Sequence, residues 1–391
     1  MLSIGFFHNL PTGGAVRIAG QHIFNLRNRF EWSIHFPEGS AALNPNAGLS
    51  LNIHPFPEGR NLSSAEKILA PFLLWKKISA FTGLCASIAQ AMEFDKVDVV
   101  FSCSSMIISA PPLLFQVSSP TIYMCHEFPR SLYEKNLSRT RSRLTDLLIL
   151  PVLRREKRMD LKAARSADII IANSSFMSPR IASIYGREPV TVRPGINTEL
   201  FSPGDHSREG SYFLSVGALS PFKGHHLAIE ALRKSQGNDY RELIVVADRS
   251  TGKYAEKLMA FARRSRVNLR ILQGISDREL IGLYRNAIAV ICAAQNEPYG
   301  LVPIEAMACG CPVIAVNQGG FIENVDNGVT GLLVPRSGSG IAGGISSILS
   351  MSPSCLNKIA ANGREFVVRE RSMWTEAEKI ANLLEQGALP S

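Results

Sequence analysis

Several features that mark other classes of protein are missing from this chain of 391 residues. Its seven cysteines are scattered, and the one close pair, Cys309 and Cys311, has no second pair or histidine cluster at metal-ligand spacing. No Gly-x-Gly-x-x-Gly follows the apolar run that ends at Phe7, which argues against a dinucleotide-dependent dehydrogenase. There is no internal repeat and no low-complexity tract. We therefore expect reduced, mostly buried thiols in a cytoplasmic protein.

Hydrophobic targeting segments are also missing from the sequence. Residues Met1–His8 lack a basic stretch and soon reach a polar residue, so no signal peptide is predicted. The uncharged run Val99–Cys125 is long enough to suggest a membrane span, but it contains several serines and the pair Pro111-Pro112. A strand, a turn and a short helix fit this run better, and no transmembrane helix is predicted.

Composition and charge indicate an ordinary globular protein with an uneven charge distribution. Hydrophobic residues make up 46% of the chain and charged residues 19%, and this length predicts two domains. Residues 1–200 carry 22 Lys and Arg against 15 Asp and Glu, which is +7 of the total net charge of +9. The basic first half suggests an anionic partner or surface on that side.

The order of apolar and helical segments predicts two doubly wound α/β domains. Apolar strands alternate with helix-length stretches in residues 1–195, and the same alternation begins again after the turn-like run Pro194–Gly204. Strands separated by helices form parallel sheets that carry helices on both faces. We predict one Rossmann-like domain at 1–195 and a second at 205–370. The helix in 371–391 is a candidate to cross back to the first domain.

Two glutamates eight residues apart are the strongest indication of function. Glu297 lies in a loop after an apolar strand, and Glu305 lies at the third position of a helix expected at Ile304–Cys309, with Pro303 at its first position. Each carboxylate alone has an ordinary interpretation, Glu305 as a helix-capping residue and Glu297 as a solvated loop charge. Two carboxylates beside the free N–H groups of a helix N-terminus instead predict a site for a sugar and a phosphate.

A second candidate segment, Gly217–Gly224, joins a strand to a helix. Lys223, His225 and His226 crowd the N-terminal end of that helix, where the helix dipole disfavours cations. A bound anion would reverse this penalty, so the segment predicts a diphosphate site. The ordinary alternative is that these side chains extend into water.

Two segments of the first half complete the candidates. Gly13 and Gly14 follow the first strand, and glycines let a backbone approach a phosphate or an acceptor closely. His126 and the residues after it follow the strand Thr121–Cys125 directly. Because ligands bind at the carboxyl ends of parallel strands, His126 is a candidate ligand contact.

The stretch Glu297–Glu305 resembles the E-x7-E signature of retaining, family 4-type glycosyltransferases. Gly217–Gly224 resembles the family's G-R-x-x-x-x-K-G segment, except that Ala218 replaces the usual arginine; Arg249 is a candidate to supply the missing cation. Tyr123–Arg130 resembles the C-H-E-x-P-R stretch of members that extend lipid-linked or surface glycans. The resemblance covers nearly the whole chain and implies the GT-B fold. In that fold two doubly wound parallel-sheet domains, one for the acceptor and one for the nucleotide sugar, face a cleft.

The same resemblance implies a role for each candidate residue. Catalytic roles fall on Glu297, His126 and Lys223, with His126 as a hydrogen-bonding partner of the transferred sugar and not as a base. Donor contacts are expected at Gly13, Gly14, Gly217, Lys223, Arg249, Gly274, Ile275, Tyr299, Gly300, Leu301, Val302 and Glu305. Acceptor contacts are expected at Arg17, Glu127 and Arg130.

The implied activity is a retaining transfer of a hexose from a GDP- or UDP-hexose to a glycan or lipid-linked acceptor, in polysaccharide biosynthesis, without a metal or other cofactor. One alternative is a non-catalytic nucleotide-sugar-binding subunit that lost its cationic clamp at Ala218; another is a nucleotide-sugar epimerase. Hydrolysis by paired carboxylates fits less well, because the second carboxylate would cap a helix and face the nucleotide.

Membrane contact is a further expectation. Ala65–Met92 mixes lysines with aromatic residues, and arginines flank the apolar run Leu147–Leu153, which suits docking on anionic lipid. A core helix with a solvated charged side gives the same pattern. The basic first half favours a peripheral protein on the inner face of a membrane. No motif supports nucleic-acid binding.

Overall fold

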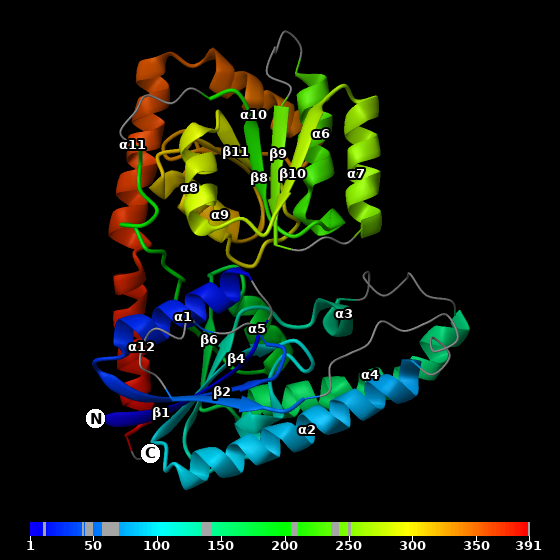
Figure 1. Cartoon of the computed structure of the whole chain (residues 1–391), viewed down its shortest axis with the longest axis vertical. Helices are drawn as coiled ribbons and strands as arrows, with labels where there is room; N and C mark the ends of the chain where they lie inside the picture. The colour runs from blue at the N-terminus through cyan, green and yellow to red at the C-terminus, as the bar shows by residue number, and fades with distance from the viewer. Residues whose placement is uncertain are drawn as a thin grey trace. The chain divides into compact units, whose positions relative to one another are not determined.

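A computed structural model describes residues 1–10, 13–40, 43, 50–56, 70–134, 143–204, 210–235, 242–248 and 252–389. Within this part of the chain the structure divides into two compact units. The first unit contains Met1–Arg193 and Ala377–Ser391, and the second contains Pro194–Glu376. Each unit is an α/β layer structure built on one parallel sheet, as the alternation of strands and helices predicts (Figure 1).

The first unit holds a sheet of seven parallel strands among its described residues, in the order β3-β2-β1-β4-β5-β6-β7. Its elements are β1 (Leu2–Asn9), α1 (Gly14–Leu26), β2 (Phe30–Pro37), β3 (Ser50–His54), α2 (Ala70–Phe94), β4 (Val99–Ser105), the 3-10 helix η2 (Pro112–Phe115), β5 (Thr121–Cys125), α3 (Arg130–Tyr133), α4 (Arg143–Ser166), β6 (Ile169–Ala172), α5 (Ser178–Tyr185) and β7 (Val190–Thr191). The central strands are fully buried because helices cover both faces of the sheet.

The last helix of the chain, α12 (Met373–Gly387), begins in the second unit and ends in the first. Ala377, Ile380, Ala381 and Leu384 of this helix are buried in the same apolar core as β1 and β2. On its outer side, Arg29 forms ion pairs with Glu378 and Glu385. The C-terminal segment is therefore an integral part of the first unit.

The second unit holds a sheet of six parallel strands in its described residues, in the order β10-β9-β8-β11-β12-β13. Its elements are β8 (Phe213–Val216), the 3-10 helix η3 (Pro221–Lys223), α6 (His225–Lys234), β9 (Glu242–Ala247), α7 (Gly252–Arg264), β10 (Asn268–Gln273), α8 (Asp277–Asn286), β11 (Ala289–Cys292), α9 (Leu301–Ala308), β12 (Val313–Val316), the 3-10 helix η4 (Gly319–Glu323), β13 (Leu332–Val334), α10 (Gly338–Ser350) and α11 (Pro353–Glu370).

One predicted helix boundary is wrong. Helix α9 begins at Leu301, with Gly300 as its N-cap in the left-handed conformation, φ 93°. Pro303 and Glu305 are therefore the third and fifth helical residues, two positions later than expected. Glu305 lies beyond the first turn and does not cap the helix.

The uncharged run Val99–Cys125 consists of β4, η2 and β5, which confirms the prediction of strands and a short helix for it. Among the described residues, one helix is long and apolar enough to cross a membrane, the Pro71–Phe94 part of α2. The core helix of a globular protein also passes that test, and α2 packs Ile78, Phe81 and Ile88 into a buried cluster.

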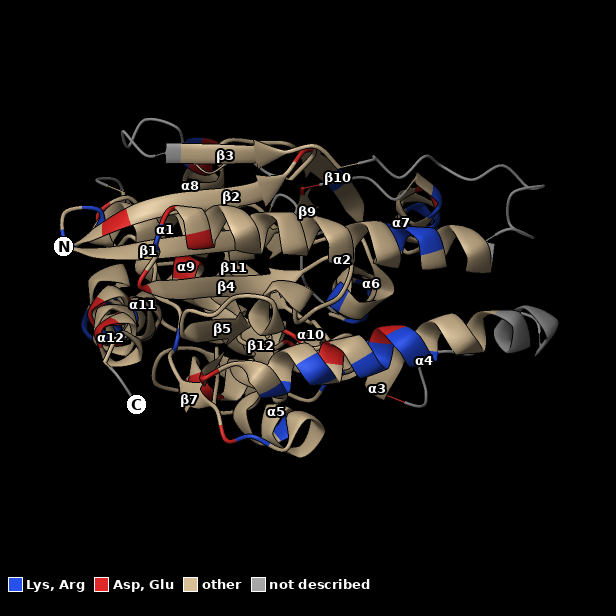
Figure 2. Ribbon diagram, turned by 90° about the horizontal axis from the view of Figure 1, so that it is seen from below, with Lys and Arg blue, Asp and Glu red and all other residues tan. Residues whose placement is uncertain are grey.

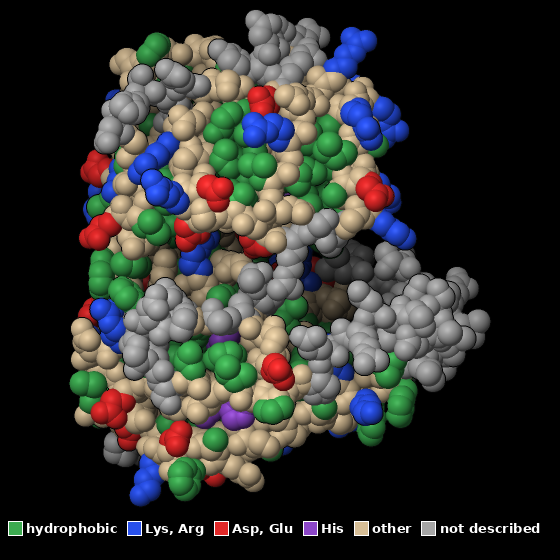
Figure 3. Space-filling model, in the orientation of Figure 1, with side chains coloured by type: hydrophobic (Ala, Val, Ile, Leu, Met, Phe, Trp, Pro, Cys, Tyr) green, Lys and Arg blue, Asp and Glu red, His purple; other side chains and the backbone are tan. Residues whose placement is uncertain are grey.

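The N-terminal halves of α2 and α4 extend past the ends of the strands and run beside each other (Figures 1 and 2). Lysines and arginines recur along α4 (Figure 2), whereas the basic residues of α2 are the adjacent pair Lys76 and Lys77. At the outer end of α2, hydrophobic and basic side chains lie together on the surface (Figure 3).

All seven cysteines are free thiols, and six of them are buried.

Candidate active site

The strand order of the second unit places its candidate site. The chain runs outward from β8 to β10 on one side of the sheet and from β11 to β13 on the other, so the order reverses between β8 and β11. In open parallel sheets, ligands bind at the carboxyl ends of the strands where this reversal occurs. The loop after β8 leads to Lys223, and the loop after β11 leads to Glu297.

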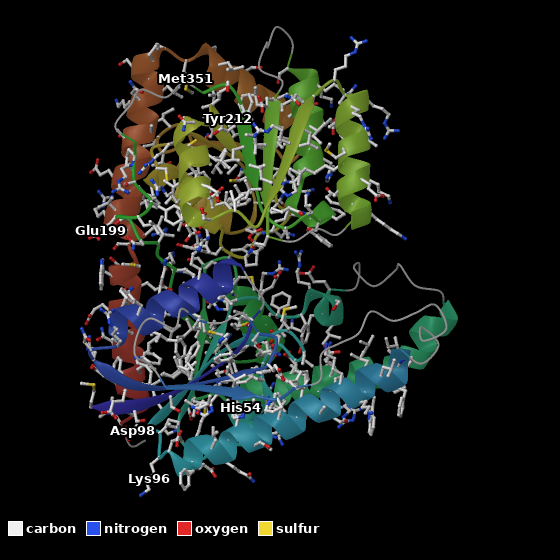
Figure 4. All side chains as sticks on the ribbon, in the orientation of Figure 1. His54, Lys96, Asp98, Glu199, Tyr212 and Met351 are labelled. Atoms are coloured by element: carbon white, nitrogen blue, oxygen red, sulfur yellow. The ribbon has the colours of Figure 1, made fainter. Side chains whose placement is uncertain are left out.

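The start of β8 is fixed against the neighbouring helix. The hydroxyl of Tyr212, labelled in Figure 4, donates a hydrogen bond of 3.0 Å to the carbonyl oxygen of Leu283 in α8. At the other end of the strand, Gly217 adopts a φ of 145°, and a Cβ there would lie 3.2 Å from the Lys223 side chain. Glycine at this position therefore leaves room for the lysine to lie across the loop.

His225 supports the loop Gly217–Gly224 through two hydrogen bonds. It is buried at the first position of α6, and its Nδ1 lies 2.9 Å from Ser215 Oγ. Its Nε2 lies 3.2 Å from the carbonyl oxygen of Ala218, which can only accept, so Nε2 carries the proton and Nδ1 accepts from Ser215. Burial lowers the pKa of His225 to about 4, so the imidazole is neutral at pH 7. His225 is a support of the loop and not one of its cations.

Lys223 and Glu297 form an ion pair at the reversal point. The Nζ atom of Lys223 lies 2.8 Å from both carboxylate oxygens of Glu297. Their side chains are 31% and 19% exposed, so a ligand can reach the pair. The pair faces a small pocket lined by Ser215, Val216, Lys223, Ile291, Cys292, Ala293, Ala294, Glu297, Gly300, Val302 and Phe321.

The N-terminus of α9 opens onto the same pocket. Gly300 and Val302 line it, and no side chain in the described ranges caps the helix. Its first N–H groups have no partner within the helix. A Cβ on Gly300 would lie 2.6 Å from the Phe321 ring, so only glycine fits this cap. Aligned N–H groups and the helix dipole make such an N-terminus a binding site for an anion. Leu301 is the first residue of this helix.

A buried amide and a buried arginine fix the approach to α9. The Nδ2 atom of Asn324 donates to the carbonyl oxygen of Tyr299 at 2.8 Å and lies 3.4 Å from that of Gly300. The Oδ1 atom of Asn324 accepts a hydrogen bond of 2.9 Å from Nε of Arg371. The Tyr299 hydroxyl donates to the carbonyl oxygen of Pro194 at 2.6 Å. Tyr299, which directly precedes the N-cap of α9, is thus held through both its carbonyl group and its side chain.

Glu305 is placed differently from Glu297. It is 2% exposed, and its Oε2 accepts a hydrogen bond of 2.9 Å from the hydroxyl of Tyr284 in α8. Gly274 and Ile275 follow β10 at the carboxyl edge of the same sheet. No heavy atom of the described part of the chain lies within 4 Å of a Cβ placed on Gly274. The expected contacts of these three residues with nucleotide and ribose remain predictions.

In the first unit, His126 directly follows β5, and its backbone N–H and carbonyl groups are both hydrogen-bonded. Its N–H donates to Ser104 Oγ at 3.1 Å, and its carbonyl oxygen accepts from Asn173 Nδ2 at 2.9 Å. Among the residues that the structure describes, none provides a hydrogen-bond partner for the buried Nε2 atom of His126. Burial and the neighbouring His22 lower the pKa of His126 to about 4, so the ring is neutral at pH 7.

The other candidates of the first unit lie at the same ends of their strands. Gly13, with φ 138°, is the N-cap of α1; Gly14 is its first residue, and the N–H of Arg17 donates to Gly13 O. Arg130 pairs with Glu134 at 3.1 Å and lies 3.9 Å from Glu127.

Of the candidate residues, Lys223, Glu297, Gly300 and Val302 line one pocket, and Gly217 lies beside the Lys223 side chain. Their roles toward a ligand stay predictions. Arg249 lies outside the described residues, so its proposed role in place of the missing arginine stays a prediction. No group of three or more His, Cys, Asp or Glu side chains in the described part of the chain is arranged to hold a metal ion.

Sequence reasoning missed Asn324, Arg371 and Tyr284. Asn324 lies 24 positions after Gly300, and Tyr284 lies 21 positions before Glu305. Arg371 acts through Asn324, 47 positions before it in the chain. Each contact is a long-range hydrogen bond. The local signal for Asn324 is its place four positions after Gly320, the second residue of the turn Gly319-Gly320.

Residues 197–366, nearly the whole second unit, match the family described as Glycosyl transferases group 1. The matched residues contain the Lys223–Glu297 pair, the pocket and the N-terminus of α9.

Curated relatives are also glycosyltransferases. The chain is similar to a D-inositol 3-phosphate glycosyltransferase of Kribbella flavida, at 32% identity over 198 residues. That match covers 45% of this chain and 47% of the relative, so the chain spans about half the length of the curated relatives it matches.

Solved structures extend the likeness to the whole fold. The chain resembles Anabaena Alr3699/HepE in complex with UDP and glucose, at 20% identity and TM-score 0.76, over 99% of this chain and 100% of the other. It also resembles sucrose-phosphate synthase from Thermosynechococcus elongatus, at 18% identity and TM-score 0.78, over 99% of each chain. The two parallel-sheet units form the GT-B fold, as predicted.

Proposed function

We propose that this protein is a retaining hexosyltransferase that moves a hexose from a nucleotide-diphosphate sugar, UDP- or GDP-linked, to a glycan or lipid-linked acceptor. The observation that carries the proposal is the Lys223–Glu297 pair beside the open N-terminus of α9. One site then offers a cation and free N–H groups for a diphosphate and a carboxylate for a sugar. The neighbour Alr3699/HepE, solved with UDP and glucose, makes UDP-glucose the first donor to test.

The charges of the pair match those that develop in the reaction. When the bond between the anomeric carbon and the diphosphate breaks, positive charge grows on the sugar ring and negative charge grows on the phosphate. Glu297 stabilises the first charge, and Lys223 with the N–H groups of Gly300, Leu301 and Val302 stabilises the second. Without a donor the two side chains neutralise each other, so neither is an isolated half-buried charge.

Retention follows from attack on the face that the diphosphate leaves. The acceptor hydroxyl oxygen bonds to the anomeric carbon while the carbon–phosphate oxygen bond breaks, and the acceptor proton passes to the departing phosphate oxygen. No protein nucleophile and no metal ion is needed for this step. The protein contributes positioning and charge stabilisation. His126, neutral at pH 7, offers a hydrogen bond to a sugar hydroxyl through its unpartnered Nε2.

The acceptor belongs to the same proposal. Arg130, with Glu127 and Arg17, is a candidate contact for a phosphate on the acceptor. The name of the Kribbella flavida relative specifies an inositol phosphate, which supports testing phosphate-bearing acceptors first.

The decisive experiment compares donor turnover in three proteins. Full-length protein is incubated with UDP-glucose, GDP-mannose and related donors, and nucleotide release is measured with and without acceptor. Glu297→Gln keeps the size of the side chain and should lower release about 10²- to 10³-fold, while UDP still binds. Lys253→Gln, at an exposed position of α7, is the matched control and should leave release unchanged. Release by Glu297→Gln at the wild-type rate would refute the assigned role.

One observation favours a second candidate, a non-catalytic nucleotide-sugar-binding subunit. Ala218 puts a methyl group where the resembled segment has an arginine, so Lys223 is the one cation that this loop presents. Such a protein would gain thermal stability from the donor without releasing nucleotide. Saturation at about 100 times the dissociation constant would add about 2.7 kcal/mol to the free energy of unfolding.

A further inference from the structure

The first turns of α2 and the middle of α4 form a surface that we call the tip surface. It consists of Phe72, Trp75, Lys76, Lys77, Leu150, Arg154, Arg155 and Arg158. Phe72 is 59% exposed, Trp75 46% and Leu150 37%, although such side chains are usually buried. The Phe72 and Trp75 rings are stacked with their centroids 6.4 Å apart. An exposed apolar patch of this kind marks an interaction site.

Helical spacing aligns most of these residues in one row on each helix. Trp75 and Lys76 lie three and four positions after Phe72 on α2. On α4, Leu150, Arg154 and Arg158 are four positions apart. Arg155 joins the two rows, since its guanidinium lies 5.3 Å from the Trp75 ring and donates to Ser79 Oγ at 3.2 Å. The opposite face of α2 packs into the core through Ile78, Phe81 and Ile88.

The charge of the tip surface is of one sign. The described stretches 71–82 and 149–158 contain one acidic residue, Glu156. The tip surface itself has five basic residues: Lys76, Lys77, Arg154, Arg155 and Arg158. Burial, together with the neighbouring Asp160, raises the pKa of Glu156 to about 7, so much of it is neutral at that pH. Basic charge among exposed aromatic and aliphatic side chains is complementary to an anionic lipid surface.

We propose that the tip surface docks the protein on an anionic lipid bilayer, with Phe72, Trp75 and Leu150 entering the interface and the five cations contacting lipid headgroups. Spanning of the bilayer by α2 is a different arrangement. It would move Ile78, Phe81, Ile88 and the rest of their buried cluster out of the core of the first unit. Docking leaves that core intact. The proposal does not depend on the proposed activity, because lipid binding needs neither donor nor acceptor.

The test is sedimentation of the full chain with vesicles of phosphatidylcholine alone or mixed with phosphatidylglycerol. Wild-type protein should pellet with the mixed vesicles at about 0.15 M salt and be released at about 0.5 M, because salt screens the charges. Lys76→Gln with Lys77→Gln should weaken binding about 25-fold, which is about fivefold for each lost charge. Lys253→Gln with Lys257→Gln, on exposed positions of α7, removes the same charge elsewhere and should bind as wild type does.

A second variant tests the apolar part without changing charge. Phe72→Ser with Trp75→Ser alters two exposed positions, so the melting temperature should stay near that of wild type while vesicle binding falls. In a Trp374→Phe background, Trp75 is the exposed tryptophan and Trp32 is buried, so a blue shift with mixed vesicles should report on Trp75. Equal binding to both vesicle types, wild-type binding by either tip variant, or a pellet that resists alkaline carbonate extraction would each overturn the proposal.

Discussion

Replacing Asn324 tests whether the approach to α9 is held as the structure indicates. Asn324→Ala removes a charged hydrogen bond from Arg371 at 2.9 Å and a neutral one to the Tyr299 carbonyl at 2.8 Å. Hydrogen bonds to charged groups contribute about 1.5–3 kcal/mol and neutral ones about 0.5–1.5 kcal/mol, so the loss is about 2–4 kcal/mol. For a unit of this size, about 2–4 °C per kcal/mol predicts a melting temperature lower by about 4–16 °C.

Donor binding should weaken in the same variant, because Tyr299 and Gly300 lead directly into the first N–H groups of α9. Asn324→Asp separates the two effects. The Asp side chain keeps the oxygen that accepts from Arg371. Its second oxygen replaces the amide N–H donor and faces the carbonyl oxygens of Tyr299 and Gly300, so this segment loses its anchor. The Asp variant should therefore bind UDP at least as poorly as the Ala variant.

Asn286→Ala, at an exposed position of α8, is the control and should change neither property. Thermal unfolding and UDP titration provide the two measurements. If Asn324→Ala melts within 1 °C of wild type and binds UDP with unchanged affinity, the reasoning about this anchor is wrong.

Three further predictions concern the second unit. Tyr284→Phe removes the hydroxyl that donates to the buried Glu305 carboxylate, which should cost about 1–3 kcal/mol in a denaturant titration; an unchanged midpoint would refute the contact. Gly320→Ala places a Cβ 2.4 Å from backbone and should abolish nucleotide binding, whereas Gly343→Ala, with open space around it, should be neutral or stabilise by up to about 1 kcal/mol. Because burial lowers the pKa of His225 to about 4, the unfolded chain binds a proton below pH 6.5 that the folded one does not; the melting temperature should fall from pH 6.5 toward 4, and His225→Gln should make that slope shallower.

Much of the fold could be predicted because its signals are local. Apolar runs such as Glu242–Ala247 became buried parallel strands, and Ser276 with Glu279 forms the capping box that starts α8. The motif around Glu297 and Lys223 could be found for the same reason, since loops that follow parallel strands end at one edge of the sheet.

The errors and omissions arose where long-range contacts decide. The start of α9 was placed too late because the conformation of Gly300 depends on the Phe321 ring packed against it, 21 positions away. The alternative interpretation of Glu305 as a helix cap is wrong because α9 begins at Leu301, and no local pattern indicates that the Tyr284 hydroxyl donates to this carboxylate. No local pattern pairs Asn324 with Arg371, which approaches from the end of α11.

The course of α12 has a consequence for how the protein is made. A ribosome releases Met1–Arg193 long before it reaches Ala377, Ile380, Ala381 and Leu384, which complete the same core. The core of the N-terminal unit therefore stays incomplete, with part of its apolar surface exposed, while Pro194–Glu376 is synthesised and folds. Nascent chains stalled before Ala377 should depend on chaperones, and adding a separate 377–391 peptide should reduce that dependence.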